Sequence, residues 1–374
     1  MARGDQAAHT VLATHATVAD VIAQREELRS YVVVIENDEP IARHLLDAEP
    51  LTVGRDESRH IVIPDARVSR LHLQVFAANG AVVAEDLGSS NGTFYEGRRI
   101  AGPVVLPEGH FLQVGSRLLK HERRSRREVE REDELRRDLD KAGSYVRALL
   151  PAPIAHGPIR TDWFYRPSTQ LGGDAFAYDL LDDDHVYACL IDVSGHGAGA
   201  AMHTVAVMNV LRRRALPDTD FRDPAAVLAG LNAMFQMDDH DGLYFTLWYG
   251  VYCVSQRRLS YGSAGHHPAY LYPPGGASVP LRTPGMMVGA MPGARFKAGS
   301  TDVPPGSALY LFSDGVFETT TPDGRQCGLD DFLPLLGRGP EGPGESEAIY
   351  RAVRQGARPG PLDDDFSLLV VRFA

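Results

Sequence analysis

The chain has 374 residues, 44% apolar and 23% charged, and its 49 acidic against 38 basic side chains leave a formal net charge of −11. This length accommodates two or three domains, and the composition excludes a chain that is disordered throughout. The acidic balance argues against a nucleic-acid partner, because such proteins present a basic face to phosphates.

Residues 1–28 are interpreted as an N-terminal leader, helical near VADVIAQREEL. They lack the apolar stretch of a signal peptide, and nowhere in the chain do eighteen apolar residues run together. The three cysteines are far apart and form no CxxC pair, which favours a reducing compartment over a zinc site. We therefore expect a cytoplasmic protein with no membrane partner.

Short β-like runs separated by turns fill residues 29–120: YVVVIE, IARHLL, LTVGR, IVI, LHLQVFAANGAVVAED and TFYEGRRI. This spacing predicts an all-β sandwich. Within it, the motifs LTVGRDES, RVSRLHLQ and DLGSSNGTF resemble the forkhead-associated (FHA) family. The resemblance implies a phosphothreonine-binding domain, whose partner is a kinase, another phosphothreonine-bearing protein or this chain itself.

The FHA resemblance also implies that loops at one end of the sandwich bind the phosphopeptide. A phosphothreonine carries roughly −1.5 to −2 charges and three acceptor oxygens, which suit a guanidinium and a hydroxyl. We expect Arg55 and Ser69 to contact the phosphate, with Arg70 beside them. Ser90 and Asn91 would hold the peptide backbone.

The segment over residues 121–150 is almost wholly charged in its first half, which predicts an exposed helix. Its second half has apolar residues spaced alternately by four and three, as in a heptad seam: Leu135, Leu139, Ala142, Val146 and Leu149. The seam covers only about two heptads, short of a coiled coil. Two interpretations therefore stay open, a linker helix that caps the next domain and a helix that forms a homodimer.

Residues 151–374 mix strands and helices. The expected strands are 185–191, 243–254, 259–263, 308–312 and 366–373, and the expected helices are 198–214, 224–235, 329–336 and 345–355. The turn-rich stretches PDGRQCG and GRGPEGPGE are expected to be loops.

Acidic residues stand beside a glycine turn or a strand end at four places in this region: Asp174, Asp192, Asp314 and the run 363–365. We expect strands of a single sheet to deliver these ends to one edge, where the carboxylates repel one another and their pKa values rise unless cations bind. All-oxygen ligands select hard ions such as Mg²⁺ or Mn²⁺. Two such ions form the usual clamp for hydrolysing a phosphoester with activated water.

Six motifs in this region occur in a definite order: LGGDAFAYDLL, DVSGHGAGAAM, FTLWYGVY, LSYGSAGHHPAYL, LYLFSDGVFET and DDDFSLLVV. Together they resemble the PPM (PP2C-like) phosphatases, in particular the SpoIIE/RsbU branch of serine/threonine phosphatases. The resemblance implies an α/β/β/α sandwich over residues 151–374. The chain is therefore expected to be multidomain, with an all-β FHA sandwich, a helical linker and a PP2C-like α/β/β/α sandwich.

The same resemblance implies a site for two Mn²⁺ or Mg²⁺ ions. Asp192 would bridge the ions, Asp314 would bind one of them, and Asp174 would orient the site. The triple acid leaves the choice between Asp364 and Asp365 open. The full implied ligand set, which includes a backbone carbonyl, is Asp174, Asp192, Val193, Asp314, Asp364 and Asp365.

The leading hypothesis is a metal-dependent phosphoserine/phosphothreonine protein phosphatase regulated through its FHA domain. The family resemblance implies a phosphoprotein substrate, a STAS-type anti-sigma-factor antagonist in a partner-switching pathway. The alternative is a phosphopeptide-binding scaffold whose phosphatase-like domain is catalytically idle. The presence of every proposed ligand acid argues against the scaffold, whereas the unusual loop sequence GHGAGAAM keeps it open.

Overall fold

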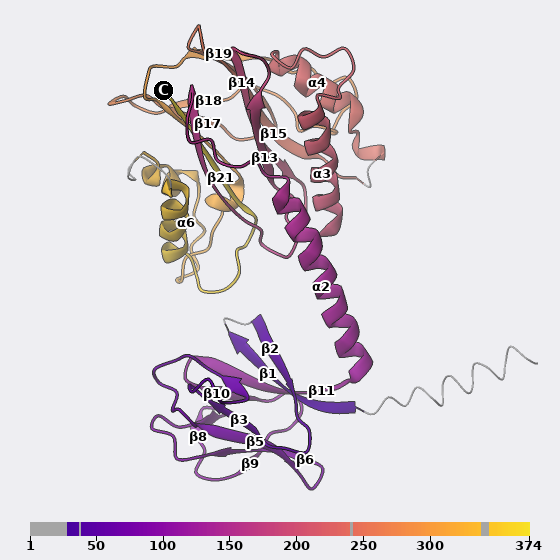
Figure 1. Ribbon diagram of the computed structural model, residues 1–374, viewed down its shortest axis with the longest axis vertical. Coiled ribbons are helices and arrows are strands. Elements are labelled where there is room, and N and C mark those ends of the chain that lie inside the picture. Colours follow the sequence, from indigo (N-terminus) through magenta and orange to yellow (C-terminus); the bar gives the residue numbers. More distant parts are fainter. Residues whose placement is uncertain (1–27, 37–38, 240–241, 338–343) are drawn as a thin grey trace, which may run out of the picture. The chain divides into compact units, whose positions relative to one another are not determined.

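A computed structural model describes residues 28–36, 39–239, 242–337 and 344–374 (Figure 1). The chain divides into two compact units, Met1–Arg136 and Arg137–Ala374. The leader expected over residues 1–28 lies, up to position 27, outside the described residues. No helix in the described ranges is long and apolar enough to cross a membrane.

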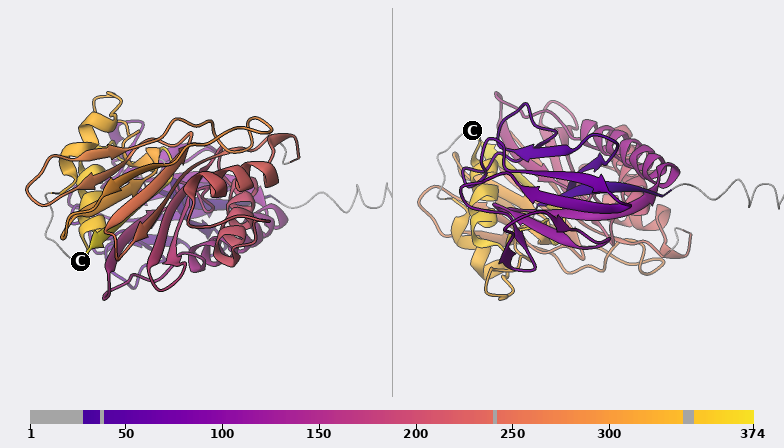
Figure 2. Two further views of the ribbon diagram at one scale, coloured as in Figure 1. Left: turned by 90° about the horizontal axis from the view of Figure 1, so that it is seen from above. Right: turned by 90° about the horizontal axis from the view of Figure 1, so that it is seen from below.

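The N-terminal unit is a sandwich of two β-sheets, seen from below in the right panel of Figure 2, which confirms the all-β prediction. The sheets have the strand orders β2-β1-β11-β10-β7-β8 and β4-β3-β5-β6-β9. Inward-facing residues such as Val32, Val53, Val75 and Leu112 form the core between them. The strands are β1 (Leu28–Glu36), β2 (Glu39–Leu45), β3 (Leu51–Gly54), β4 (Ile61–Val62), β5 (Leu73–Ala78), β6 (Ala81–Asp86), β7 (Phe94–Tyr95), β8 (Arg98–Arg99), β9 (Val104–Val105), β10 (Phe111–Val114) and β11 (Arg117–Ser125).

Strand β11 continues five residues beyond the expected end of the sandwich at position 120. It pairs antiparallel with β1, from Leu28 opposite Ser125 to Ile35 opposite Leu118. The sequence obscured this strand because its end, KHERRS, is charged; in the structure the charged side chains alternate with buried His121 and Ser125.

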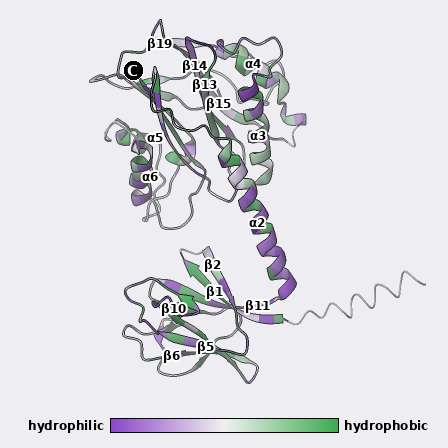
Figure 3. Ribbon diagram, in the orientation of Figure 1, coloured by the Kyte–Doolittle hydropathy of each residue, from purple (hydrophilic) through white to green (hydrophobic). Residues whose placement is uncertain are grey.

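Helix α2 (Arg126–Ala148) follows β11 directly and confirms the predicted linker helix. Its start is a capping box, in which Glu128 N donates to Ser125 Oγ (3.2 Å) and Ser125 N donates to the Glu128 carboxylate (3.0 Å). Figure 3 shows that the first half of the helix is strongly hydrophilic.

The C-terminal half of α2 packs onto its own unit. Val146 is buried against Leu171 and Ala201, with Leu139 beside them. The C-terminal half of the predicted seam therefore packs within the C-terminal unit. For this half, the interpretation as a helix that caps the domain is favoured. Leu135 stays 61% exposed.

The C-terminal unit contains two five-stranded sheets, with the orders β13-β14-β15-β16-β19 and β12-β21-β20-β17-β18. Its strands are β12 (Ile159–Arg166), β13 (Ala175–Leu180), β14 (His185–Val193), β15 (Phe245–Cys253), β16 (Arg258–Ala264), β17 (Ala269–Tyr272), β18 (Val279–Leu281), β19 (Gly299–Asp302), β20 (Ala308–Phe312) and β21 (Phe366–Phe373). Its helices are α3 (Ala198–Arg213), α4 (Pro224–Met234), α5 (Leu329–Phe332) and α6 (Glu345–Gly356), and short 3-10 turns cover Met237–Asp239, Asp314–Val316 and Leu333–Leu335. The five predicted strands are present, and so are the four predicted helices, except that the helix expected over 329–336 is the short α5 followed by the 3-10 turn Leu333–Leu335.

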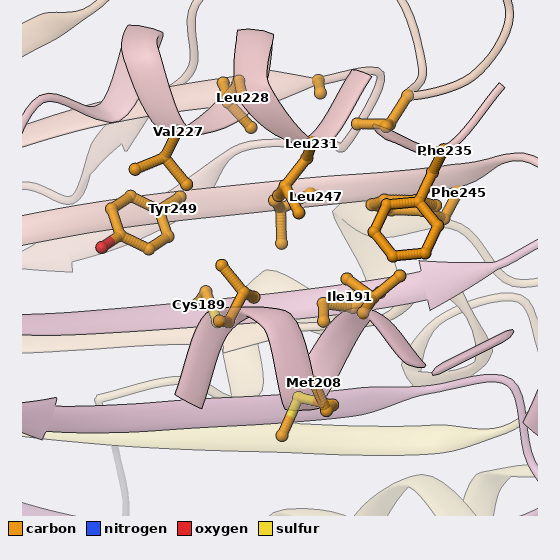
Figure 4. Packing of buried hydrophobic residues seen from close by; sticks show 14 of the residues in the cluster. Cys189, Ile191, Met208, Val227, Leu228, Leu231, Phe235, Phe245, Leu247 and Tyr249 are labelled. Atoms are coloured by element: carbon orange, nitrogen blue, oxygen red, sulfur yellow. The ribbon is translucent and has the colours of Figure 1, made fainter. Parts of the chain in front are cut away.

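Three apolar layers hold this unit together. Met208 of α3 and Leu231 of α4 pack with Ile191 and Leu247 on one face of the first sheet (Figure 4). A second core, which includes Trp248, fills the space between the two sheets, and a third lies under α5 and α6. The left panel of Figure 2 shows α3 and α4 on the opposite side of the sheets from α6. This order of layers confirms the α/β/β/α sandwich.

Candidate active site and candidate phosphopeptide site

The predicted acids meet in a cavity of about 320 Å³ at one end of the sandwich. Its wall is lined by Ser168, Asp192, Val193, Ser194, Gly195, His196, Tyr244, Thr246, Asp314, Asp363, Asp364 and Asp365. Asp192 lies next to the end of β14, Asp314 follows β20, and Asp364 precedes β21. The expectation that one sheet delivers all of these residues is wrong, because β14 belongs to the first sheet whereas β20 and β21 belong to the second.

The carboxylates repel one another in this cavity. Burial, together with the negative charges of Asp314 and Asp364, raises the pKa of Asp192 to about 8. Burial and the charge of Glu318 raise the pKa of Asp314. Burial and the charge of Asp314 raise the pKa of Asp364. Glu318 was not among the predicted site residues, although it stands in the same motif four residues after Asp314.

Asp174 lies behind this cavity and is 3% exposed. Its pKa is well above the ordinary range because of burial first and the charge of Asp192 second. Its Oδ2 is buried and has no hydrogen-bond partner among the described residues. A buried acceptor in this state is costly unless a cation or a proton occupies it.

Gly173 brings the backbone of the Asp174 turn against the end of β14. A Cβ on Gly173 would lie 2.7 Å from the carbonyl oxygen of Val193, the predicted backbone ligand. Only glycine therefore permits this approach.

Asp365 is engaged by four donors. Its Oδ1 accepts from Ser168 N (2.7 Å) and Ser168 Oγ (2.9 Å), and its Oδ2 accepts from Gly173 N (2.6 Å) and Asp174 N (3.4 Å). Both oxygens therefore tie the turn before β13 to the start of β21. Asp363 is also engaged, through Arg358 and through Thr320 Oγ1. Of the triple acid, Asp364 has the carboxylate that is least committed to the protein, because its Oδ1 accepts only from the neighbouring Asp365 N.

The cavity acids are held apart from one another. Among the described residues, the one group of three His, Cys, Asp or Glu side chains with ligand atoms within 4.8 Å of one another is Asp184, His185 and Cys253. There Asp184 already accepts from Ser255 N (2.7 Å) and from Cys253 Sγ (3.2 Å). Within the described ranges, no three carboxylates of the cavity come this close together.

The five predicted phosphopeptide residues lie on three loops at one end of the N-terminal sandwich. Arg55 follows β3, Ser69 and Arg70 precede β5, and Ser90 and Asn91 lie between β6 and β7. The loops are joined by hydrogen bonds from Arg55 N to Ser69 O (2.9 Å) and from Ser90 N to Ser69 Oγ (3.1 Å). The side chains of Arg55, Arg70 and Asn91 are exposed, and the Nδ2 of Asn91 donates to Arg67 O (2.7 Å).

Two residues fix the shape of these loops. His72 is fully buried, accepts from Ser69 N through Nδ1 (3.1 Å) and places Nε2 3.2 Å from the carbonyl oxygen of Gly92. Burial lowers the pKa of His72, which keeps the ring neutral. A Cβ on Gly54 would lie 2.2 Å from the carbonyl oxygen of Arg70, so Gly54 allows the first two loops to touch.

Comparison with known families matches both units. The family model of Stage II sporulation protein E (SpoIIE) matches residues 182–374, and the FHA domain model matches residues 51–115. The N-terminal sandwich is therefore an FHA domain, and the SpoIIE match covers more than half of the chain.

Individual relatives agree with this division. The phosphoserine phosphatase RsbP of Bacillus subtilis is 27% identical over 202 residues, 53% of this chain and 48% of that protein. The FHA domain-containing protein FhaB of Mycobacterium tuberculosis is 30% identical over 92 residues, 25% of this chain and 59% of that protein. The structure of the SiaA-PP2C domain of Pseudomonas aeruginosa has a TM-score of 0.56 at 21% identity and covers 65% of this chain and 98% of that domain, which establishes a PP2C-like fold. The chain spans about half the length of RsbP.

Proposed function

This chain belongs to the SpoIIE family of PP2C-like proteins, and on that premise we propose that it is a metal-dependent protein serine/threonine phosphatase. The observation that carries the proposal is the meeting of Asp192, Asp314 and Asp364 in one cavity, where burial and mutual repulsion raise the pKa of each. Such a cluster is stable at neutral pH when cations neutralise it.

The residues of the cavity suit two hard divalent ions, Mn²⁺ or Mg²⁺. All donors are oxygens, and Asp174 contributes a buried oxygen without a partner. We assign Asp192, Asp314, Asp364 and the Val193 carbonyl as ligands. When bound, the ions would activate a water molecule and polarise the phosphoester.

Hydrogen bonds within the protein fix the positions of the carboxylates around the cavity. We assign Asp365 as a positioning residue rather than a ligand, because both of its oxygens already accept hydrogen bonds from the protein. Asp174, fixed by the same turn, would orient the site and accept a proton during hydrolysis. Burial and the nearby charge of Asp192 raise its pKa, so its carboxylate binds a proton more strongly than an exposed aspartate does.

The substrate proposed is a phosphoprotein, and specifically the phosphoserine of a STAS-type anti-sigma-factor antagonist in the cytoplasm. Two relatives from Bacillus subtilis, RsbP and RsbU, are phosphoserine phosphatases, which supports the phosphoserine part of this proposal. The FHA domain would bind a phosphothreonine-bearing partner through Arg55, Ser69, Arg70, Ser90 and Asn91 and so regulate the phosphatase.

A homodimer through α2 is proposed for the part of the helix that does not pack on its own unit. Leu135 and Tyr145 are each 61% exposed, which is unusual for side chains of this size. Light scattering on the wild type and on Leu135→Glu tests this point: a dimer that the substitution dissociates supports it, and a monomeric wild type overturns it.

The proposed activity is tested by hydrolysis of p-nitrophenyl phosphate with Mn²⁺, with Mg²⁺ and with EDTA, alongside calorimetric titration of the metals. We expect turnover that requires the metal and is abolished in Asp192→Asn and Asp314→Asn while both variants stay folded. Full activity of either variant would contradict the assignment of that ligand. Metal binding without turnover on p-nitrophenyl phosphate or a phosphoserine peptide would contradict the enzyme and favour the scaffold.

A further inference from the structure

The segment of residues 282–297, RTPGMMVGAMPGARFK, stands out from the rest of the chain by its charge. It carries the basic residues Arg282, Arg295 and Lys297 and no acidic residue, although the chain as a whole has a net charge of −11. All three basic side chains are exposed. It also exposes Met286 and Met291 to 45% and 47%.

The backbone of this segment is held beside the proposed active site. Phe245 N donates to Val288 O (3.2 Å) and Val288 N donates to Phe245 O (2.9 Å). Phe245 in turn pairs with Val193, which lines the acidic cavity. Ala294 and Phe296 are buried in the core under α3 and α4. The exposed methionines are therefore presented by an anchored segment.

Two further exposed methionines lie on the neighbouring helices. Asn232, at the end of α4, donates from its Nδ2 to Met291 O (3.0 Å) and accepts from Gly289 N (3.0 Å), which joins the segment to the helix that ends at Met234. The ring of His203 in α3 packs 5.3 Å from that of Phe235, the residue after α4. Met202 is 73% exposed and Met234 is 38% exposed.

We call the exposed side chains of this one segment the methionine surface: its apolar residues are Met286 and Met291, and its rim consists of the segment's basic residues Arg282, Arg295 and Lys297. Clusters of exposed apolar residues rimmed by polar ones mark interaction sites, and methionine adapts to the shape of a partner. Burial lowers the pKa of His267, and the charge of Arg282 lowers it further. The ring of His267 stacks on Phe312, two residues before Asp314.

We propose that the methionine surface docks the phosphoprotein substrate, and that the substrate presents acidic residues around its phosphoserine. The inference rests on the proposed phosphatase function and adds the class of surface that the enzyme recognises. The three basic side chains of the segment, with no acidic residue among them, complement acidic residues on a substrate. Complementary charge of this kind sets specificity and association rate.

The test uses variants in an Arg55→Ala background, so that binding at the FHA loops does not contribute. Arg295→Glu/Lys297→Glu reverses the rim charge, and Met286→Ser/Met291→Ser removes the apolar side chains. Arg213→Glu is the matched control, because Arg213 is an exposed arginine at the opposite end of α3 from the cavity. The substrates are p-nitrophenyl phosphate, a phosphoserine peptide flanked by glutamates, the same peptide flanked by glutamines, and β-casein as an acidic phosphoserine protein.

We expect the parent to prefer the glutamate peptide over the glutamine peptide in kcat/KM by about tenfold at low salt, with the preference falling as salt rises. The charge reversal should abolish this preference, and the methionine variant should raise KM for β-casein by about tenfold, the size expected for losing one or two apolar contacts. Neither variant should change turnover of p-nitrophenyl phosphate, and the control should behave as the parent.

A charge-reversed variant that keeps the parental preference for the acidic peptide would overturn the proposal. Equal loss of p-nitrophenyl phosphate turnover would also overturn it, because the change would then act on the cavity. If the parent hydrolyses none of the substrates, the proposed function fails, and fluorescence anisotropy of the labelled glutamate peptide decides the docking alone. Binding that the charge reversal weakens supports docking, and unchanged binding refutes it.

Discussion

Asp192→Asn is expected to stabilise the metal-free protein while it destroys the enzyme. The Asp192 carboxyl has its pKa raised from 3.8 to about 8 in the folded state by burial and by the charges of Asp314 and Asp364. An acid whose pKa is higher in the folded state than in the unfolded chain lowers the stability of the fold. It does so at every pH at which this carboxyl is ionised in the unfolded chain. An asparagine of nearly the same shape removes the titrating group and its repulsion.

The size of the effect follows from proton linkage. At pH 7 the folded carboxyl is mostly protonated, whereas in the unfolded chain it is ionised. Between pH 3.8, the ordinary pKa of the group, and pH 7, the free energy of proton uptake accumulates at about 1.4 kcal/mol per pH unit, or about 4 kcal/mol in total as an upper bound. This penalty disappears as the pH falls toward 4, so the gain of stability in the variant should disappear there too.

Urea unfolding of the C-terminal unit in EDTA, followed at pH 7 and pH 4.5, measures this difference. Asp179→Asn is the control, because Asp179 is exposed on β13 in the same unit. Adding Mn²⁺ at a hundredfold excess over its Kd should stabilise the wild type by about 2.7 kcal/mol and leave the Asp192→Asn variant unchanged. A variant that is less stable than the wild type in EDTA at pH 7 would refute the reasoning from charge repulsion.

The remaining predictions concern the other elements of the two sites. Asp365→Ala should lower the stability of the C-terminal unit by about 3 kcal/mol in urea, since it leaves the donors of Ser168 and Gly173 without an acceptor; an unchanged midpoint would show that water replaces the carboxylate. Arg55→Ala should weaken binding of a phosphothreonine peptide about tenfold or more in fluorescence anisotropy, because a charge-assisted hydrogen bond contributes about 1.5–3 kcal/mol, and p-nitrophenyl phosphate turnover should not change. Gly54→Ala should impair the same binding, since the added Cβ would lie 2.2 Å from a backbone carbonyl oxygen of the neighbouring loop; binding equal to the wild type would mean that the loops move apart without consequence.

Several elements were predictable because their signals are local. The apolar run that ends near Asp192 and the glycines after it predicted β14 and the start of α3 to within two residues. Alternating apolar positions and turn residues likewise predicted the FHA sandwich. The motif order was sufficient to identify both families, because each motif is a short stretch whose spacing the sequence contains directly.

The sequence by itself therefore determined the element types, the family and the set of acids, since these depend on neighbouring residues. Only the tertiary structure shows how each acid is held. Asp365 and Ser168 are 197 residues apart, yet their hydrogen bonds distinguish a positioning carboxylate from the candidate ligand Asp364 beside it. The sequence alone also did not show that two sheets contribute acids to one cavity, or which methionines are exposed. Burial, exposure and pKa shifts depend on contacts between segments that are distant in the chain.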